Sequence, residues 1–176
     1  MDLEEKTLNS IQLYNGIIVK LYLDDVLCPN GIKAKREIIR HPGGAAILCI
    51  NDNKILLIKQ FRYPYKEIIY EIPAGKLEKN EDPKNAAIRE FEEETGRKSN
   101  DLKFLGKVYP TVGYTDEIIY IYLAKNYKVT ETHLDKDEFI ETIEVTIDEF
   151  KEMVKDGRIK DAKTICAFTY YLLNVA

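Results

Sequence analysis

Residues Gly75 to Arg97, GKLEKNEDPKNAAIREFEEETGR, carry the strongest structural signal in this chain. Asp82 is suited to cap the start of a helix, and Pro83 suits the first helical turn. Gly96 stands where a helix can end in the left-handed conformation. The stretch therefore predicts a helix over Pro83–Thr95.

Four glutamates fall within five positions near the end of this predicted helix. Glu90, Glu93 and Glu94 are three and four residues apart, so their carboxylates share one helix face, whereas Glu92 points elsewhere. Like charges at this spacing cost about 0.2–0.5 kcal/mol per pair, a penalty that a bound cation would turn into attraction. Oxygen ligands at this density suit Mg²⁺ or Mn²⁺ without ranking the two. A solvated acidic face is the alternative, because most charge runs carry no chemistry.

The whole stretch resembles the Nudix box, a motif of metal-dependent hydrolases. Gly75 permits a tight turn before the helix, and Arg89 can pair with Glu81 to fix the loop against the helix. Arg97 is the one departure, since the motif has a bulky apolar residue there. The matching positions are Gly75, Glu81, Arg89, Glu90, Phe91, Glu93, Glu94 and Gly96.

The resemblance implies a divalent metal ion bound by Glu90 and Glu94, with the carbonyl of Ala74 completing the ligand set. It implies that Glu93 is a further ligand or an acid–base group, so Glu93 and Glu94 are also expected to be catalytic. Such an ion bridges a diphosphate, neutralises its charge and helps to activate water. We expect Mg²⁺, with Mn²⁺ as an alternative.

Motifs outside the box resemble those of bacterial ADP-ribose pyrophosphatases. They are CPNG (28–31), KREIIRHPGG (35–44), KQFRYP (59–64), EIPAGK (71–76), GYTDE (113–117) and DEFIE (137–141). The resemblance implies hydrolysis of ADP-ribose to AMP and ribose 5-phosphate. It also implies a homodimer whose N-terminal sheets exchange and help to build each other's active site.

Two alternatives to this function stay open. Val112 stands where that subfamily usually has a proline, so other nucleoside diphosphate sugars or dinucleotides are alternative substrates. A non-catalytic ADP-ribose sensor is the other alternative, although degenerate binders usually lose box glutamates that this chain keeps.

The resemblance also implies four substrate-binding residues. Arg62 is expected near the diphosphate, whose oxygens a guanidinium can hold bidentately. Arg36 corresponds to a position that helps to hold adenine, typically across the dimer. Glu117 corresponds to a contact with the terminal ribose, where Gly113 permits close backbone approach. A surface ion pair is the alternative role for Arg62.

The general base is expected in DKDEFIE (135–141), where the subfamily has a glutamate on a mobile loop. We align that glutamate with Glu138, and the neighbouring Asp137 is the alternative. A carboxylate there can accept a proton from water as it attacks phosphorus, a contribution of about 10²–10⁴-fold. A solvated acidic loop is the interpretation without chemistry.

Composition limits the remaining possibilities. The 176 residues are 45% hydrophobic with a net charge of −4, which fits one globular domain, or one with a small N-terminal appendage. No basic stripe points to nucleic acid. The acidic N-terminus does not resemble a signal peptide, and no run approaches a membrane span. Cys28, Cys49 and Cys166 lack metal-ligand spacing and are expected to be reduced thiols, so we expect a soluble, cytoplasmic protein.

The order of predicted elements indicates an α/β fold. Strand-like runs at 17–28 and 34–41, joined by an Asn-Gly step, predict a small antiparallel β unit within residues 1–41. Residues 42–176 are expected to form the hydrolase domain, an α/β/α sandwich with a mixed sheet between helices, as in the Nudix fold. Its expected strands are 45–50, 54–61, 68–76, 103–110, 117–126 and 139–147, and its helices are 83–95, 147–155 and 160–173.

Overall fold

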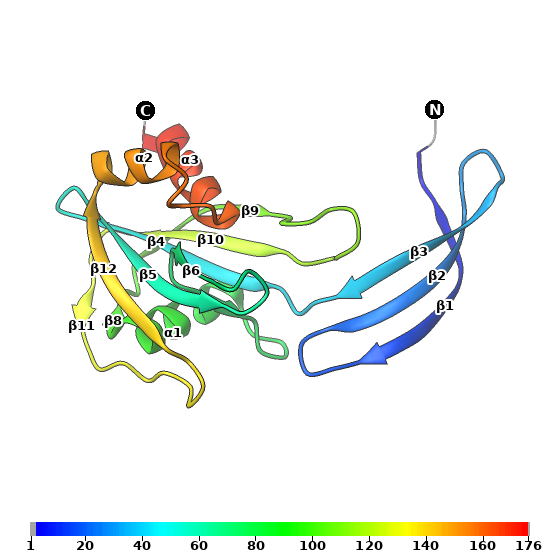
Figure 1. The fold of residues 1–176 in the computed structure, drawn as a ribbon, viewed down its shortest axis with the longest axis horizontal. Helices are drawn as coiled ribbons and strands as arrows, with labels where there is room; N and C mark the ends of the chain where they lie inside the picture. Colours follow the sequence, from blue (N-terminus) through cyan, green and yellow to red (C-terminus); the bar gives the residue numbers. More distant parts are fainter. Residues whose placement is uncertain (1–2, 176) are drawn as a thin grey trace. The chain divides into compact units, whose positions relative to one another are not determined.

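The computed structural model describes residues 3–175, which form two compact units (Figure 1). Unit 1 contains the described residues up to Gly43 together with Tyr109–Ile118. Unit 2 contains Gly44–Val108 and the described residues from Ile119 onward. The segment Tyr109–Ile118 therefore belongs with the N-terminal unit, although it lies far away in sequence.

Unit 1 is built on a three-stranded antiparallel sheet. Its order is β1 (Lys6–Asn15), β2 (Lys20–Leu27) and β3 (Lys33–Arg40). The predicted strands are confirmed as β2 and β3, whereas β1 was not predicted. All ten residues of β1 are exposed, so this strand has no buried face to impose an apolar alternation on its sequence.

The segment Tyr109–Ile118 is hydrogen-bonded to the end of β3. The backbone amide of Ile39 donates to the carbonyl of Tyr114 at 2.7 Å, and the amide of Asp116 donates to the carbonyl of Ile39 at 3.2 Å. The Asp116 carboxylate accepts from the amide of His41 at 2.8 Å and from Arg40 Nη1 at 3.1 Å. These four bonds attach the 113–117 motif to the sheet of unit 1.

Unit 2 contains a seven-stranded mixed sheet. Its central order is β12-β5-β4-β10-β9, with β6 paired to β5 and β7 to β4. In this sheet only the β4–β10 pairing is parallel. Two further short strands of unit 2, β8 and β11, form a separate antiparallel pair. The strands are β4 (Gly44–Asn51), β5 (Lys54–Arg62), β6 (Glu67–Glu71), β7 (Ala74–Lys76), β8 (Arg97–Lys98), β9 (Leu102–Val108), β10 (Ile119–Ala124), β11 (Lys128–Val129) and β12 (Ile140–Thr146).

Helices cover both faces of this sheet, which confirms the expected α/β/α sandwich. Helix α1 (Pro83–Thr95) lies on one face, and α2 (Ile147–Lys155) and α3 (Ala162–Val175) lie on the other (Figure 1). Successive residues of β4 alternate between two apolar cores. Ala45, Ile47 and Cys49 pack with Ala87 and Phe91 of α1, whereas Ala46, Leu48 and Ile50 pack with Phe150 of α2 and Phe168 of α3.

Helix α1 has the predicted ends. Asp82 Oδ1 accepts hydrogen bonds from the amides of Lys84 at 2.9 Å and Asn85 at 3.2 Å. Gly96 ends the helix with φ of 61°, in the left-handed region that glycine tolerates. These two caps fix where the glutamate-bearing turns lie on the sheet.

The predicted strand 68–76 is divided into β6 and β7. Pro73 has no amide hydrogen to donate to a ladder, and it falls at the break. The amide of Ile72 instead donates to the hydroxyl of Thr164 on α3 at 2.9 Å. Residues on the two sides of the break therefore pair with different strands, β6 with β5 and β7 with β4.

Within residues 3–175, none of the helices has both the length and the apolar character needed to cross a bilayer.

Candidate active site

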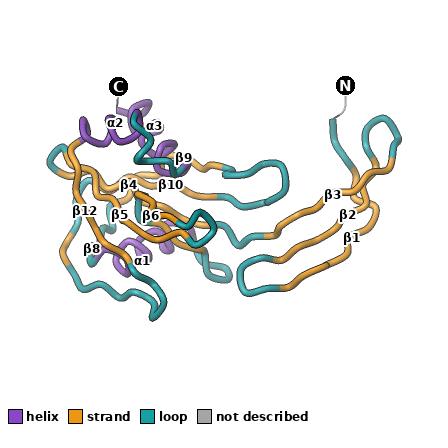
Figure 2. Tube along the Cα trace, in the orientation of Figure 1, coloured by secondary structure: helices purple, strands orange, loops and turns teal. Residues whose placement is uncertain are grey.

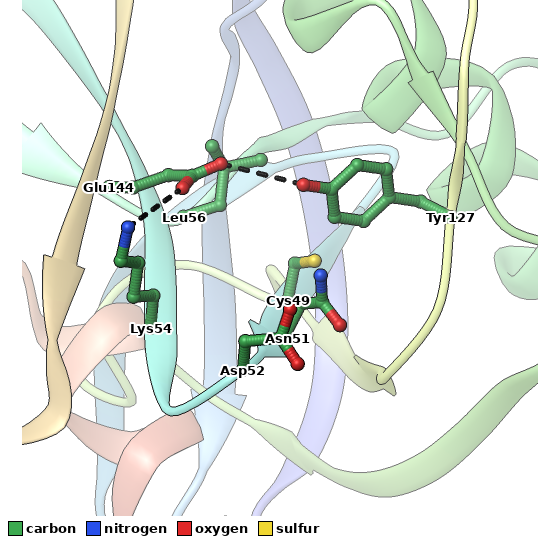
Figure 3. A pocket seen from close by; sticks show the side chains of 7 residues that line it. All are labelled: Cys49, Asn51, Asp52, Lys54, Leu56, Tyr127 and Glu144. Atoms are coloured by element: carbon green, nitrogen blue, oxygen red, sulfur yellow. Dashed lines mark hydrogen bonds and ion pairs between the residues drawn. The ribbon is translucent and has the colours of Figure 1, made fainter.

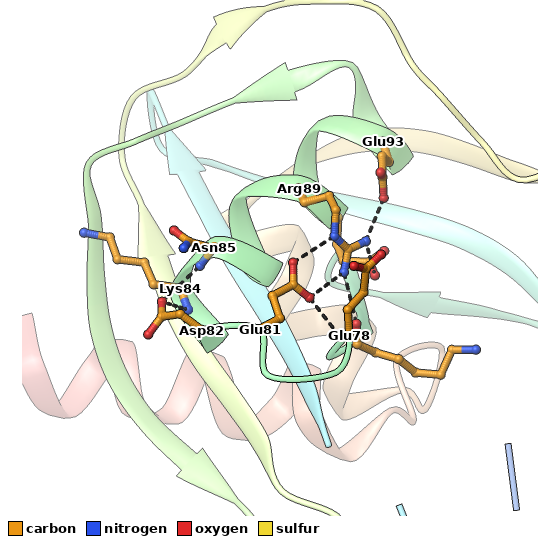
Figure 4. Close-up of polar contacts among 9 residues, drawn as sticks. Glu78, Glu81, Asp82, Lys84, Asn85, Arg89 and Glu93 are labelled. Atoms are coloured by element: carbon orange, nitrogen blue, oxygen red, sulfur yellow. Dashed lines mark hydrogen bonds and ion pairs between the residues drawn. The ribbon is translucent and has the colours of Figure 1, made fainter. Parts of the chain in front are cut away.

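Arg89 connects the loop before α1 to the glutamates on the helix. Its Nε and Nη2 atoms donate to the two oxygens of Glu81, each at 3.0 Å, which confirms the predicted pairing (Figure 4). Nη1 donates to Glu90 Oε1 at 2.8 Å and to Glu93 Oε2 at 2.9 Å, and Nη2 also reaches the carbonyl of Lys76 at 3.1 Å. The hydrogen bonds to Glu81, and then those to Glu90 and Glu93, raise the pKa of Arg89. One guanidinium thus holds three carboxylates and the loop.

Gly75 makes room for the Glu90 carboxylate. A Cβ atom at residue 75 would lie 1.9 Å from Glu90 Cδ, far inside van der Waals contact. The glycine is therefore needed for close approach, and its φ is not in the left-handed region. Burial raises the pKa of Glu90, and Arg89 opposes part of that rise.

Glu94 is a buried carboxylate beside the β7 strand. Its residue is 5% exposed, and its Oε2 atom accepts a hydrogen bond from the amide of Ala74 at 2.9 Å. Burial raises the pKa of Glu94 to about 8, and the nearby charges of Glu90 and Glu138 add to the rise. Near neutral pH this group therefore favours either a proton or a cation as its partner.

The donor set fits a hard divalent cation. Within the described part of the chain, no three His, Cys, Asp or Glu side chains already converge as a metal site. However, burial raises the pKa values of the half-buried Glu90 and the buried Glu94, and Gly75 leaves a recess in which the Glu90 carboxylate lies. Carboxylate oxygens are the ligands that Mg²⁺ and Mn²⁺ accept.

Glu138 belongs to the segment between β11 and β12. Figure 2 draws the long segment that leads into β12 as a loop, in teal. This loop is attached to the end of α1 by two backbone hydrogen bonds. The amide of Thr130 donates to the carbonyl of Gly96 at 2.7 Å, and the amide of His133 donates to the backbone carbonyl of Glu93 at 3.0 Å. Burial is the largest cause of the raised pKa values of Glu90 and Glu94, and the negative charge of Glu138 makes a smaller contribution in the same direction. The structure therefore places Glu138 within electrostatic range of both box glutamates.

Arg62 forms a bidentate ion pair with Glu71. Its Nε donates to Glu71 Oε1 at 2.5 Å and its Nη2 to Oε2 at 2.8 Å. Lys163 of α3 also donates to Glu71 Oε2. The structure thus shows an ion pair at Arg62, and its expected contact with a diphosphate stays a prediction. Sequence reasoning missed Glu71 and Lys163, which are 92 positions apart.

The other expected substrate-binding residues lie in unit 1. On β3, Arg36 donates through Nε to Glu5 Oε2 at 3.0 Å, and its Nη2 contacts Glu5 Oε1. Glu117 lies 3.5 Å from His41 Nδ1. A Cβ at Gly113 would meet no atom within 4 Å, so the chain itself does not require glycine there. The structure brings Gly113 and Glu117 to β3, and the roles of all three residues in binding stay predictions.

A separate polar pocket lies at the β4–β5 turn (Figure 3). Glu144 links two of its walls, since it pairs with Lys54 at 3.9 Å and accepts from the Tyr127 hydroxyl at 3.4 Å. Burial raises the pKa of the Cys49 thiol in this pocket to about 12. Because the thiolate is the reactive form, Cys49 is a packing residue here, and all three cysteines of the chain are free.

Replacing Gly75 by alanine should displace the Glu90 carboxylate and weaken divalent-ion binding by about 10–100-fold. Isothermal titration calorimetry with Mn²⁺ measures this affinity. In a chain that already carries Glu90→Gln, the same Gly75→Ala change should add little. Wild-type affinity in Gly75→Ala, with the fold intact by circular dichroism, would show that the recess does not position a ligand.

Comparison with known proteins agrees with this geometry. A family model described as the NUDIX domain matches residues 40–168. The chain is 47% identical to a methanol dehydrogenase activator of Bacillus methanolicus, covering 98% of this chain and 95% of that protein. It is 45% identical to an ADP-ribose pyrophosphatase of Bacillus subtilis (strain 168), covering 99% and 96%. A crystal structure of an ADP compounds hydrolase shares the fold, with a TM-score of 0.86 at 20% identity over 97% of this chain and 94% of that one. The chain belongs to the Nudix family.

Proposed function

We propose that this Nudix protein hydrolyses the diphosphate bond of ADP-ribose to AMP and ribose 5-phosphate, using Mg²⁺ or, alternatively, Mn²⁺. The Bacillus subtilis relative, 45% identical over nearly the whole chain, bears the name of that activity. The Bacillus methanolicus relative is named for an enzyme that it activates, so its name gives no substrate. The choice of ADP-ribose therefore follows the pyrophosphatase.

The placement of Glu90 against Gly75, and of Glu94 beside the amide of Ala74, is the observation that carries this proposal. Both carboxylates are on α1, and the charge of Glu138, on a loop far along the chain, adds to the rise of their pKa values. An arrangement of this kind suits an anionic substrate only when a cation accompanies it, because the carboxylates alone would repel a diphosphate.

Glu90, Glu93, Glu94 and the carbonyl of Ala74 would hold the metal ion. When bound, that ion would neutralise charge on the diphosphate and make water a better nucleophile. Arg89 keeps Glu90 and Glu93 in place from the side of the loop. Glu138 then accepts the proton of the attacking water, and Arg62 binds oxygens of the diphosphate.

Glu94→Gln should lower magnesium-dependent turnover of ADP-ribose by about 100-fold or more, because it removes a buried metal ligand. Glu92→Gln is the matched control on the same helix, since Glu92 is paired with Lys98 at 2.6 Å and should be dispensable. Chromatography of the products, across ADP-ribose and a panel of nucleoside diphosphate sugars and dinucleotides, measures both activity and preference.

The outcomes of this panel separate the alternative functions. Faster cleavage of another nucleoside diphosphate compound would support the proposed active site and identify that compound, rather than ADP-ribose, as the preferred substrate. Binding of ADP-ribose without turnover in the wild type would favour a sensor. Equal losses in Glu92→Gln and Glu94→Gln would contradict the assignment of the metal ligands.

Glu138→Gln should lower kcat by about 10²–10⁴-fold with the fold intact, since it removes the proposed proton acceptor. Asp137→Asn is the matched control and also tests the neighbouring candidate. The measurement is the initial rate under saturating substrate and Mg²⁺. Near-normal turnover in Glu138→Gln, together with a large loss in Asp137→Asn, would reassign the base to Asp137.

The proposal includes a homodimer in which N-terminal units, residues 1–41, exchange beside hydrolase domains, residues 42–176. Strand β1 exposes Leu8, Ile11 and Leu13, each at least half exposed. Unit 2 has a hollow lined in part by Phe61, Ile68 and Phe139, which are also exposed. Two such apolar surfaces are suited to cover each other between copies.

Light scattering should give twice the chain mass of 20.4 kDa for the wild type. Ile11→Lys should shift the mass toward a single chain, because it places a charge on the exposed face of β1. A wild-type mass of one chain would remove the support for an adenine contact by Arg36 across the dimer.

We also propose a cytoplasmic location. The free thiols of Cys28, Cys49 and Cys166 are compatible with a reducing compartment. Recovery of the protein in the secreted fraction of its cells would contradict this.

A further inference from the structure

Glu71, at the end of β6, is a buried carboxylate held between two cations. Its side chain is 3% exposed. One cation is the guanidinium of Arg62, which donates two hydrogen bonds, and the other is the ammonium of Lys163. Burial alone would raise the pKa of Glu71, but the bonds and charges of its partners outweigh burial and hold that pKa below its usual value. The carboxylate is therefore ionised in the folded protein.

Lys163 is itself fixed by the start of α3. It lies 3.1 Å from Asp161 Oδ2, and its side chain is 11% exposed. The hydroxyl of Thr164 donates to the same Asp161 oxygen at 2.6 Å and accepts from the amide of Ile72 at 2.9 Å. These bonds connect α3 to the residue directly after Glu71, so the ammonium has little freedom to move.

Only part of the Arg62 guanidinium is used by this cluster. Its Nε and Nη2 atoms donate hydrogen bonds to Glu71. Among the described residues, none accepts a hydrogen bond from its Nη1 atom. The Arg62 side chain is 37% exposed, whereas Glu71 is buried. After the bonds to Glu71, the charge of Glu94 is among those that raise the pKa of Arg62. The guanidinium is therefore held on one edge and open on another, within electrostatic range of Glu94.

We propose that Glu71, fixed by Lys163, is a positioning residue that aims the open edge of Arg62 at the substrate diphosphate. This inference rests on the proposed function. A guanidinium binds phosphate oxygens well only when its planar fork is oriented, and a bidentate carboxylate supplies that orientation. Lys163 shares the Glu71 carboxylate with Arg62, so this carboxylate does not depend on Arg62 alone. The open edge of the Arg62 guanidinium remains available to an anionic ligand.

A double-mutant cycle tests whether Glu71 acts through Arg62. Glu71→Gln, Arg62→Ala and the double variant are compared for KM and kcat on ADP-ribose, and for the Kd of ADP by calorimetry. Glu71→Gln should raise KM and Kd by about ten-fold with a smaller effect on kcat, because the lost interaction is charge-assisted. The double variant should be no weaker than Arg62→Ala alone.

Lys160→Gln is the matched control. It breaks an exposed ion pair with Glu67, at 2.8 Å, that joins the segment just before α3 to β6. KM and Kd should not change in this variant. If Glu71→Gln does not fold, Lys163→Gln carries the same test, and Lys163→Arg should restore most of the lost affinity.

Additive effects in the cycle, or a lower melting temperature with unchanged KM and Kd, would overturn the positioning role. A wild type that binds ADP, and loses that binding in Glu71→Gln, but does not cleave ADP-ribose would refute the proposed function alone. A wild type that binds neither ADP nor ADP-ribose would overturn both.

Discussion

The ion pairs of Arg89 are the interaction on which the site depends. Helix α1 gathers carboxylates that repel one another, and the loop between β7 and α1, residues 77–82, has no strand or helix of its own to hold it. Arg89 joins Glu81, Glu90 and Glu93 through one planar group. One positive charge cannot neutralise three carboxylates and the nearby Glu94 as well. The residual negative charge is what makes the face suited to a divalent ion rather than to another side chain.

The break between β6 and β7 adds a second constraint. Glu71 ends one strand and contacts Arg62 and Lys163, whereas Ala74 begins the next and donates to Glu94. A segment of four residues thus connects the ion-pair cluster of Arg62 and Lys163 to the carboxylates of α1. The charge of Lys163 acts on Glu94, where it partly offsets the rise that burial causes in the pKa. A diphosphate accompanied by a metal ion presents both signs of charge, so a carboxylate face beside a guanidinium with an open edge suits it.

Local sequence signals predicted the parts of this arrangement that local forces determine. Caps at Asp82 and Gly96 gave both ends of α1, and helical spacing gave the shared face of its glutamates. Strand β1 was not predicted, because none of its residues is buried and its sequence therefore lacks the apolar alternation of a half-buried strand. The ion-pair cluster at Glu71 escaped because tertiary packing makes it: Lys163 reaches Glu71 across 92 positions, and no local spacing encodes that contact. Arg97, the departure from the motif, instead donates to the carbonyl of Thr95 and to Glu144.

The valine at position 112 does not leave the following segment without support. A proline there would restrict the chain, but Val112 is 82% exposed and packs little against its surroundings. The residues after it are held by other means, since Tyr114 and Asp116 are hydrogen-bonded to Ile39 of β3. The rigidity of the segment that carries Glu117 therefore comes from pairing with the sheet of unit 1. If Glu117 binds the terminal sugar as predicted, its position therefore does not require the backbone restriction that a proline would add.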